Sequence, residues 1–354
     1  MRARRRILIV LVVVLATAAF LPTAYAKNKR SLTVMTYNLY FGADLGPVVA
    51  AADAGLAEFI GAAYQAWADA HATDFARRME AVADQIAERE PDLVGLQEVA
   101  QWRTGTLGDP AAAETVDADF LALLLAALED RGLDYDVVAA ASGFDIEAPL
   151  VPLGVDGRLT ISDVLIARRG LPASDFKLSN PQTGSYATFV TLPTAEPLPD
   201  IEFPRQWASV DVKLRGKSLR FVTTHLESVS QLVRVAQAQE LLEIHEDAGL
   251  PLVFVGDFNS QPGGDAAAVL IGGTLDDTFA GFIGGEPTCC QNGDVDNSVS
   301  ELDTRIDLIL ADGDRFTPIA ADVVGDAPGD RTDSGRWPSD HAGVVGELLL
   351  APKG

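Results

Sequence analysis

Apolar runs that resemble buried β-strands recur along this chain, and each one ends abruptly in a polar residue or carries a buried acid. They read "TVMTYN", "LVGLQE", "FVTTH", "VFVGDFN" and "RIDLIL", and Ala-rich or amphipathic stretches separate them. Strands that alternate with helices in this way predict an α/β fold. The chain has no internal repeat, and no linker divides it cleanly. We therefore expect one α/β domain over residues 27–354.

The periodicity of the sequence places the expected elements. Helical spacing predicts helices over residues 47–70, 74–89, 116–131 and 230–246. Strand patterns cover residues 31–42, 91–99, 135–141, 161–168, 305–311 and 341–350, and a hairpin turns at Arg215-Gly216-Lys217. Residues 149–204 are rich in proline and predict long loops around short strands.

The stretch "VFVGDFNSQP" at residues 253–262 shows the pattern most clearly, because Asp257 and Asn259 follow a buried strand. Residues i and i+2 of an extended chain point to the same side. These two side chains are therefore expected to face one point beyond the sheet. The alternative is an Asx-type turn that caps the next helix.

The other strand ends add a chemically related set of residues. It comprises Asn38, Glu98, His225, Asp307, Asp340 and His341. Each of them alone also fits a turn, a cap or a solvent-facing position, and a single histidine on an apolar strand is more often structural. The remaining histidines, His71 and His245, have the spacing of exposed helical residues and receive no role.

The set as a whole favours metal-assisted hydrolysis. Glu98, Asn38, Asp257, Asn259 and Asp340 offer hard oxygen donors, which suit Mg²⁺, Mn²⁺ or Ca²⁺ better than zinc. Two histidines supply acid–base groups. Because no serine or cysteine stands in a nucleophile elbow, an activated water is the expected nucleophile.

The motifs "YN", "LQEV", "THL", "GDFN", "RIDLIL" and "SDH", in this order, resemble the endonuclease/exonuclease/phosphatase superfamily over about residues 31–350. This superfamily includes deoxyribonuclease-like and sphingomyelinase-like phosphoesterases. The resemblance implies a four-layer α/β/β/α sandwich with two packed, mostly antiparallel sheets. It also implies a site where strand ends from both sheets meet.

The resemblance further implies the metal ligands and the phosphate contacts. Glu98 would be the principal metal ligand, with Asn38 beside it and Asp340 close to the metal. Asn259 would hold a phosphate oxygen, and His225 would stabilise the phosphoryl charge or protonate the leaving group.

The acid–base roles follow from the same resemblance. Asp257 would orient or deprotonate the attacking water, and His341 would act as acid or base, oriented by Asp307. Asp163 stands where the family often carries asparagine, so it is either an additional site residue or a plain substitution. Arg205 is a candidate contact to the substrate phosphate.

The charge of the chain bears on its substrate. The formal net charge is -24, and residues 1–26 carry four arginines and no acid, so the remainder carries 23 - 51 = -28. Such a surface repels a nucleic-acid backbone at long range. We expect a phosphoesterase acting on a phospholipid headgroup, a nucleic acid or a small phosphate ester. A deoxyribonuclease and an inactive exported binding module are the alternatives.

Two further features concern the compartment. "MRARRRILIVLVVVLATAAFLPTAYA" has the basic, apolar and small-residue regions of a secretory signal peptide, with cleavage expected after Ala26. Export favours oxidation of the only two cysteines, Cys289 and Cys290, although bridging adjacent residues is strained. The sequence leaves a vicinal disulfide and two free thiols open, and it makes a zinc site less favoured.

Overall fold

The structure is a computed structural model, and it describes residues 31–196, 198–246, 248–278, 281–282 and 285–350. The predicted signal peptide, residues 1–26, lies outside these residues. None of the helices in the described ranges is both long and apolar enough to cross a membrane.

The first of two large sheets holds seven strands in the order β14-β15-β1-β2-β5-β4, with β3 paired to β2. The pair β1–β2 is parallel, and the other pairs are antiparallel. The strands are β1 (Ser31–Asn38), β2 (Leu93–Thr106), β3 (Thr115–Asp119), β4 (Tyr135–Leu150), β5 (Val155–Arg168), β14 (Phe316–Val324) and β15 (Gly343–Leu350).

The second large sheet holds six strands in the order β12-β13-β11-β10-β9-β6, and only β10–β11 is parallel. Its strands are β6 (Phe176–Ser185), β9 (Gln206–Leu214), β10 (Lys217–His225), β11 (Leu252–Asp257), β12 (Leu275–Asp277) and β13 (Asp307–Asp312). A separate hairpin pairs β7 (Val190–Leu192) with β8 (Ile201–Phe203).

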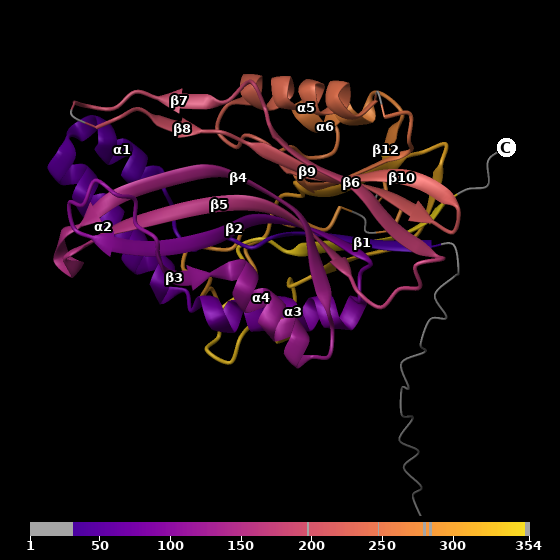
Figure 1. Cartoon of the computed structure of the whole chain (residues 1–354), viewed down its shortest axis with the longest axis horizontal. Coiled ribbons are helices and arrows are strands. Elements are labelled where there is room, and N and C mark those ends of the chain that lie inside the picture. The colour runs from indigo at the N-terminus through magenta and orange to yellow at the C-terminus, as the bar shows by residue number, and fades with distance from the viewer. Residues whose placement is uncertain (1–30, 197, 247, 279–280, 283–284, 351–354) are drawn as a thin grey trace, which may run out of the picture.

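Helices cover the outer faces of both sheets (Figure 1). The helices α3 and α4 lie on the first sheet, α5 and α6 lie on the second, and α1 and α2 lie at the far end of β4. Their bounds are α1 (Gly46–Ala54), α2 (Leu56–Ala72), α3 (Phe75–Arg89), α4 (Phe120–Asp130), α5 (Gln231–Glu246) and α6 (Asp265–Ile271), with 3₁₀ turns η1 (Val151–Leu153) and η2 (Pro328–Asp330).

Three apolar cores separate these layers. One lies between α3, α4 and the first sheet, a second between the two sheets, and a third between the second sheet and α5 with α6. In α3, Phe75, Met79, Val82 and Ile86 form the buried face, as helical spacing requires. The predicted four-layer α/β/β/α sandwich with mostly antiparallel sheets is confirmed.

Several predicted boundaries are wrong. The helix predicted over residues 116–131 begins only at Phe120, because residues 115–119 extend the sheet as β3 and Asp119 caps α4 by accepting from the Ala122 N–H. The helix predicted over residues 47–70 is two helices that meet at Gly55. The strands β2, β4 and β5 run several residues further than predicted. The division into a single domain stays a prediction.

Candidate active site

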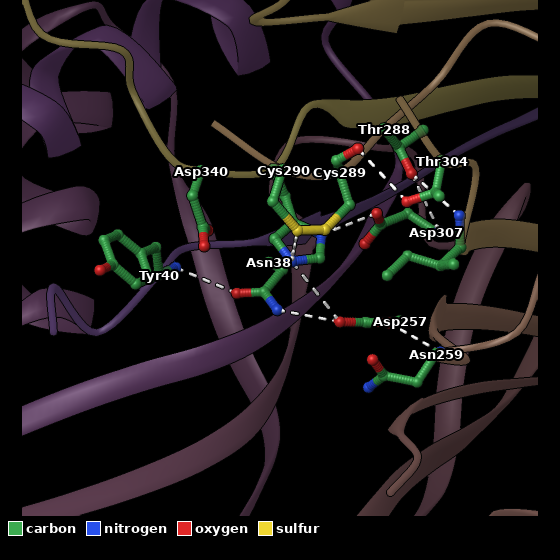
Figure 2. The surroundings of a disulfide bond; sticks show 12 residues. Asn38, Tyr40, Asp257, Asn259, Thr288, Cys289, Cys290, Thr304, Asp307 and Asp340 are labelled. Atoms are coloured by element: carbon green, nitrogen blue, oxygen red, sulfur yellow. Dashed lines mark hydrogen bonds and ion pairs between the residues drawn. A yellow bond between two sulfur atoms is a disulfide. The ribbon is translucent and has the colours of Figure 1, made fainter. Parts of the chain in front are cut away.

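Strand register brings the polar strand ends to one place. In the second sheet His225 lies opposite Asp257, and Asp257 lies opposite Asp307. In the first sheet Asn38 ends β1, and its Nδ2 donates to Asp257 Oδ2 at 3.2 Å, across the two sheets. Figure 2 shows these two side chains pointing toward each other. The site therefore lies where the ends of both sheets meet.

Gly256 allows β10 and β11 to approach closely just before the site. Its φ is +153°, and a Cβ at this position would overlap with the Thr224 carbonyl oxygen. A side chain here would push the strands apart, and with them His225 and Asp257. The glycine of the "GDFN" motif is thus a steric requirement of the register.

Asp257 and Asn259 form a tight turn, and both face the site. The Asn259 N–H donates to Asp257 Oδ1 at 2.8 Å, and Asn259 has a left-handed φ of 48°. The next helix, α6, begins only at Asp265, so neither side chain caps it. Asn259 Nδ2 donates to the Leu226 carbonyl at 2.9 Å and lies 3.1 Å from His225 Nε2. The Asx-type turn exists, and it directs these two groups into the site.

A β-bulge directs Glu98 toward the site. The register between β2 and β5 shifts between Leu96 and Val99, and Glu98 has a φ of 53°. Bulges of this kind redirect side chains beside functional sites. Glu98 Oε2 accepts from the Phe41 N–H at 3.2 Å, and Asn38 Oδ1 accepts from the adjacent Tyr40 N–H at 3.0 Å. Glu98 and Asn38 are therefore neighbours in the site, as the resemblance implies.

His341 and Asp307 form a buried pair. His341 Nδ1 lies 2.8 Å from Asp307 Oδ2, so the carboxylate accepts the Nδ1 proton and leaves Nε2 facing Asp257 Oδ2 at 3.8 Å. Burial alone would lower the pKa of His341, but the Asp307 carboxylate and the other nearby acids outweigh it and hold the pKa well above 6.5. In this environment the imidazole is a cation with an available Nε2–H.

His225 has the opposite electrostatic environment. Burial, together with the positive charges of Arg205 and His341, holds the pKa of His225 well below 6.5. Its Nε2 lies 3.4 Å from Asp257 Oδ2. The two histidines of the site therefore differ in charge near neutral pH, which suits one for donating a proton and the other for accepting a hydrogen bond.

Three carboxylates in the site have a raised pKa. Burial is the largest cause for Asp163, Asp257 and Asp340, and repulsion from the Glu98 carboxylate adds to it in each case. Arg205 partly offsets this effect at Asp163. Negative charge is thus under-compensated here, and a divalent cation would compensate it.

The donor set fits such a cation. Asn38, Glu98 and Asp340 offer hard oxygens beside one another, which is the chemistry that Mg²⁺ or Mn²⁺ prefers. A second group, Asp257 with Asp307 and His341, places its ligand atoms within 4.8 Å of one another. The first group can hold a divalent ion while His341 stays protonated, and the roles assigned to the individual residues stay predictions.

The remaining predicted residues lie on the wall of the site. Asp163 on β5 is only 4% exposed, and its carboxylate accepts the backbone N–H of His225. Asp163 therefore links the two sheets. Arg205 Nε lies 3.5 Å from Glu227 Oε2, and its Nη2 donates to Ser228 Oγ at 3.2 Å. Arg205 lies close enough for its positive charge to lower the pKa of both Asp163 and His225. Its contact with the substrate phosphate stays a prediction.

The sequence analysis missed Arg78, a fully buried arginine behind the site. Its guanidinium donates to the carbonyl oxygens of Leu39, Tyr40 and Pro338. These carbonyls belong to the loops that follow Asn38 and precede Asp340. A signal was present in the sequence, because Arg78 follows Phe75 by three residues on the apolar face of α3.

The structure also joins Cys289 and Cys290 in a vicinal disulfide, so the alternative of two free thiols does not hold in it (Figure 2). The bond lies beside His341, and Cys290 Sγ is 3.9 Å from the imidazole Nε2. No property of the sequence indicated this contact.

A cavity of about 430 Å³ lies between β4, which is the edge strand of the first sheet, and the β7–β8 hairpin. Pro204 lines it, and its chain neighbour is Arg205 on the wall of the site. Its walls combine apolar groups with four acids and no Lys or Arg from the described chain; the acids are Asp145, Glu147, Asp200 and Glu202. Within the described residues, only Asp145 of these four forms an ion pair.

This layer order, with polar groups from both sheets meeting at one edge, defines the phosphoesterase and nuclease class of α/β sandwiches. Comparison with known proteins identifies the family. Residues 35–341 match the Endonuclease/Exonuclease/phosphatase family, and the chain belongs to it. Members of this family are divalent-metal-dependent hydrolases of phosphate esters.

Individual relatives share the fold or part of the sequence. Mouse tyrosyl-DNA phosphodiesterase 2 is 28% identical over 162 residues, which cover 42% of each chain, so this chain spans less than half the length of that relative. Among solved structures, an endonuclease/exonuclease/phosphatase family protein of Bacteroides thetaiotaomicron has a TM-score of 0.56 at 18% identity. The match covers 91% of this chain and 98% of the Bacteroides chain. A mannosyl-6-phosphatase of the same species has a TM-score of 0.55 at 18% identity, covering 90% and 100%.

Proposed function

We propose that this chain is an exported, divalent-metal-dependent phosphoesterase that cleaves a phosphodiester or phosphomonoester with water. The observation that carries the proposal is the position of Asp257. Its Oδ2 lies within 4 Å of Asn38 Nδ2, His225 Nε2 and His341 Nε2. A carboxylate surrounded by two histidines and an amide, beside further hard oxygen donors, is suited to hydrolysis without a covalent enzyme intermediate.

The cation and the donors around it would handle the charge of the phosphate. A divalent ion held by Asn38, Glu98 and Asp340 would neutralise phosphate oxygens during the reaction. Asn259 directs its amide toward the same space as His225. We assign to the Asn259 amide the binding of a non-bridging phosphate oxygen as its negative charge increases, with the neutral His225 imidazole beside it.

Proton transfer falls to Asp257 and His341. A base is most effective when its pKa lies near the working pH, and burial raises the pKa of Asp257 above that of an ordinary aspartate. We therefore assign to Asp257 the orientation and deprotonation of the attacking water. His341 keeps its Nε2–H because Asp307 stabilises the cation, and it can donate that proton to the leaving group or a phosphate oxygen.

The cavity beside the site supports a small substrate over a nucleic acid. Its apolar and acidic lining suits an uncharged or cationic group attached to the phosphate, and it opposes a second row of phosphates. The runner-up function is a deoxyribonuclease of the same fold. The partial match to tyrosyl-DNA phosphodiesterase 2 is the observation that favours it.

The metal dependence can be tested directly. Hydrolysis of bis-p-nitrophenyl phosphate should disappear in EDTA and return with Mg²⁺ or Mn²⁺, because the proposed ligands are oxygens. In Glu98→Gln the Mg²⁺ concentration for half-maximal activity should rise, whereas Glu58→Gln, on the exposed first turn of α2, should match the wild type. Full activity in metal-free protein would rule the mechanism out.

A matched substrate pair tests the substrate class. We compare the p-nitrophenyl phosphodiesters of choline and of its neutral carbon isostere, 3,3-dimethylbutanol. A preference for the cationic member that falls in Glu202→Gln supports the cavity as its binding place. Faster cleavage of plasmid DNA than of either ester would favour the nuclease. No turnover of any phosphate ester would favour the inactive binding module.

Export is the other part of the proposal. The basic and apolar start of the chain supports it, together with the small residues that end at Ala26. Protein recovered from the medium of an expressing culture should begin at Lys27 by N-terminal sequencing. Protein that remains in the cells with Met1 intact would contradict this part and leave the hydrolase proposal standing.

A further inference from the structure

The segment that carries the vicinal disulfide is held between the two loops that carry His341 and Asp307. On one side the Ala342 N–H donates to the Thr288 carbonyl at 2.7 Å, and the Gln291 N–H donates to the Asp340 carbonyl at 2.8 Å. On the other side Thr288 Oγ1 accepts from the Asp307 N–H at 3.1 Å. Figure 2 shows the disulfide near Thr288, Asp307 and Asp340. The backbone thus ties the two cysteines to both halves of the His–Asp pair.

The disulfide also contacts the reactive side of the imidazole. Asp307 holds His341 by Nδ1, whereas Cys290 Sγ lies 3.9 Å from Nε2 and Asp257 Oδ2 lies 3.8 Å from it. Cys289 is only 5% exposed, whereas Cys290 is more accessible, so the pair reaches from the core to the site. Nε2 is therefore confined between a disulfide sulfur and a carboxylate.

We propose that the Cys289–Cys290 disulfide positions His341 for the reaction, so that its reduction lowers turnover. This inference rests on the proposed phosphoesterase function. The disulfide links both side chains into one rigid group without an S–H donor. After reduction each thiol rotates freely, the sulfurs separate to non-bonded distance, and a thiol or thiolate can bond with the imidazole Nε2. The proton that His341 should deliver to the substrate would then have a competing partner.

The redox step requires a dithiol as reductant. A dithiol thiolate attacks Cys290 Sγ, which is the more exposed of the two sulfurs, and Cys289 leaves as a thiolate. The second thiol of the reductant resolves the mixed disulfide. Two electrons and two protons pass to the protein, which gains two thiols, while the dithiol becomes a cyclic disulfide. Oxidation of the protein thiols reverses the change.

The kinetic test compares the turnover of bis-p-nitrophenyl phosphate with Mg²⁺ by the oxidised, reduced and reoxidised mature protein. Positioned proton transfer contributes about 10² to 10⁴-fold in rate, so loss of the position should lower kcat by about 10-fold or more. KM should change much less, because metal and phosphate ligands stay in place. Reoxidation should restore kcat. An unchanged kcat in protein whose reduction is verified by thiol titration would overturn the proposal.

Two variants separate positioning from side effects of the reductant. In the double variant Cys289→Ser/Cys290→Ser, kcat should be low and insensitive to dithiothreitol. In His341→Ala, the residual rate should not respond to reduction, since the group being positioned is absent. A loss of rate in both variants equal to that of the wild type would show metal chelation by the reductant, and it would refute the positioning role.

An NMR readout separates this proposal from the proposed function. The chain has four histidines, so ¹⁵N-histidine labelling gives few imidazole signals, and His341→Ala identifies one of them. Reduction should shift the Nε2 signal of His341 and leave that of His71 unchanged. If the His341 signal shifts in a protein that hydrolyses no phosphate ester, the contact between the disulfide and His341 is supported and the proposed phosphoesterase function is refuted. Unchanged His341 signals in the reduced, active enzyme refute the contact alone.

Discussion

Asp257 and His341 show how individual side chains in this site depend on one another. Asp257 contacts groups from both sheets, and its raised pKa comes from burial and from Asp307, the same residue that stabilises the His341 cation. The negative charge of Asp307 therefore raises the pKa of both Asp257 and His341. Substitutions in this group of three should be non-additive.

The pair formed by His341 and Asp307 gives the first prediction. His341→Ala should lower kcat by about 10²-fold or more, because a positioned proton donor is lost. Asp307→Asn should cost a large part of the same factor, since the imidazole loses the partner that fixes its tautomer. The double variant should be little worse than His341→Ala, and metal affinity should stay close to normal. A double-mutant cycle on kcat with Mg²⁺ titrations checks this. Effects that multiply independently, or rescue of His341→Ala by Mg²⁺, would contradict the assignment.

His245 was expected on an exposed helix face, and the structure buries it completely against Trp207 and Phe254. It follows Leu241 by four residues, which places it on the apolar face of α5. Neither ring nitrogen has a hydrogen-bond partner in the described part of the chain. Burial, with a smaller contribution from Arg220, lowers the pKa of His245 to about 4, although Asp211 opposes it.

This burial predicts an acid-sensitive contribution to stability. The folded pKa lies below the unfolded value of about 6.5, so the unfolded state binds more protons between pH 6.5 and 4. The contribution is complete above that window and is lost as the pH falls. Between pH 7 and pH 5 the wild type should therefore lose about 2 kcal/mol more of its free energy of unfolding than His245→Phe loses. Urea unfolding at both pH values measures this, with His71→Gln as the control. Equal losses in wild type and His245→Phe would contradict it.

Helix α3 contributes to the site through one side chain on its inner face. Arg78 is fully buried, and its guanidinium satisfies three backbone carbonyls in the two loops that carry Asn38 and Asp340. Burial lowers the pKa of Arg78 to about 10, although the nearby acid Asp340 opposes this. The side chain therefore stays charged at neutral pH and connects the helix to both loops.

Arg78→Met should destabilise the protein by about 3 kcal/mol or more, because it leaves the three carbonyls buried without donors. Arg77→Met, at the exposed neighbouring position, should change stability by no more than about 0.5 kcal/mol. Urea unfolding of both variants checks this difference. A mild Arg78→Met would indicate that water replaces the guanidinium, in which case the site loops do not depend on α3.

The sequence predicted those elements whose periodicity reflects burial. The hairpin at β9–β10, the helices α3 and α5, and the strand ends at Asp257 and His225 agree with the structure. The failures have a common cause. Residues 115–119 are mostly exposed in β3, so no apolar alternation marked them as a strand. The bulge at Glu98, the carbonyl partners of Arg78 and the disulfide at His341 depend on tertiary contacts, which a linear pattern does not encode.

The molecule as a whole combines a strongly acidic surface with a site for an anionic group. The formal charge of residues 27–354 is -28, from 23 basic and 51 acidic residues. The cavity beside the site adds four acids to this field. A phosphate ester must therefore approach against long-range repulsion, which a cation bound at the site would reverse only locally. Small substrates fit this field better than long polyanions.

This charge distribution predicts weak binding to DNA in the absence of metal. A protein gains affinity for duplex DNA by neutralising phosphates and releasing counterions, and in residues 27–354 the arginines are scattered along the sequence apart from the pairs at 77–78 and 168–169. Fluorescence anisotropy with a short labelled duplex, in EDTA at about 150 mM salt, should therefore show no saturable binding at micromolar protein, and lowering the salt should help little. Arg205→Ala should leave this result unchanged, since one arginine contributes at most one counterion to the salt dependence. Micromolar or tighter affinity with a steep salt dependence would show a concentrated basic surface and make the deoxyribonuclease the preferred function.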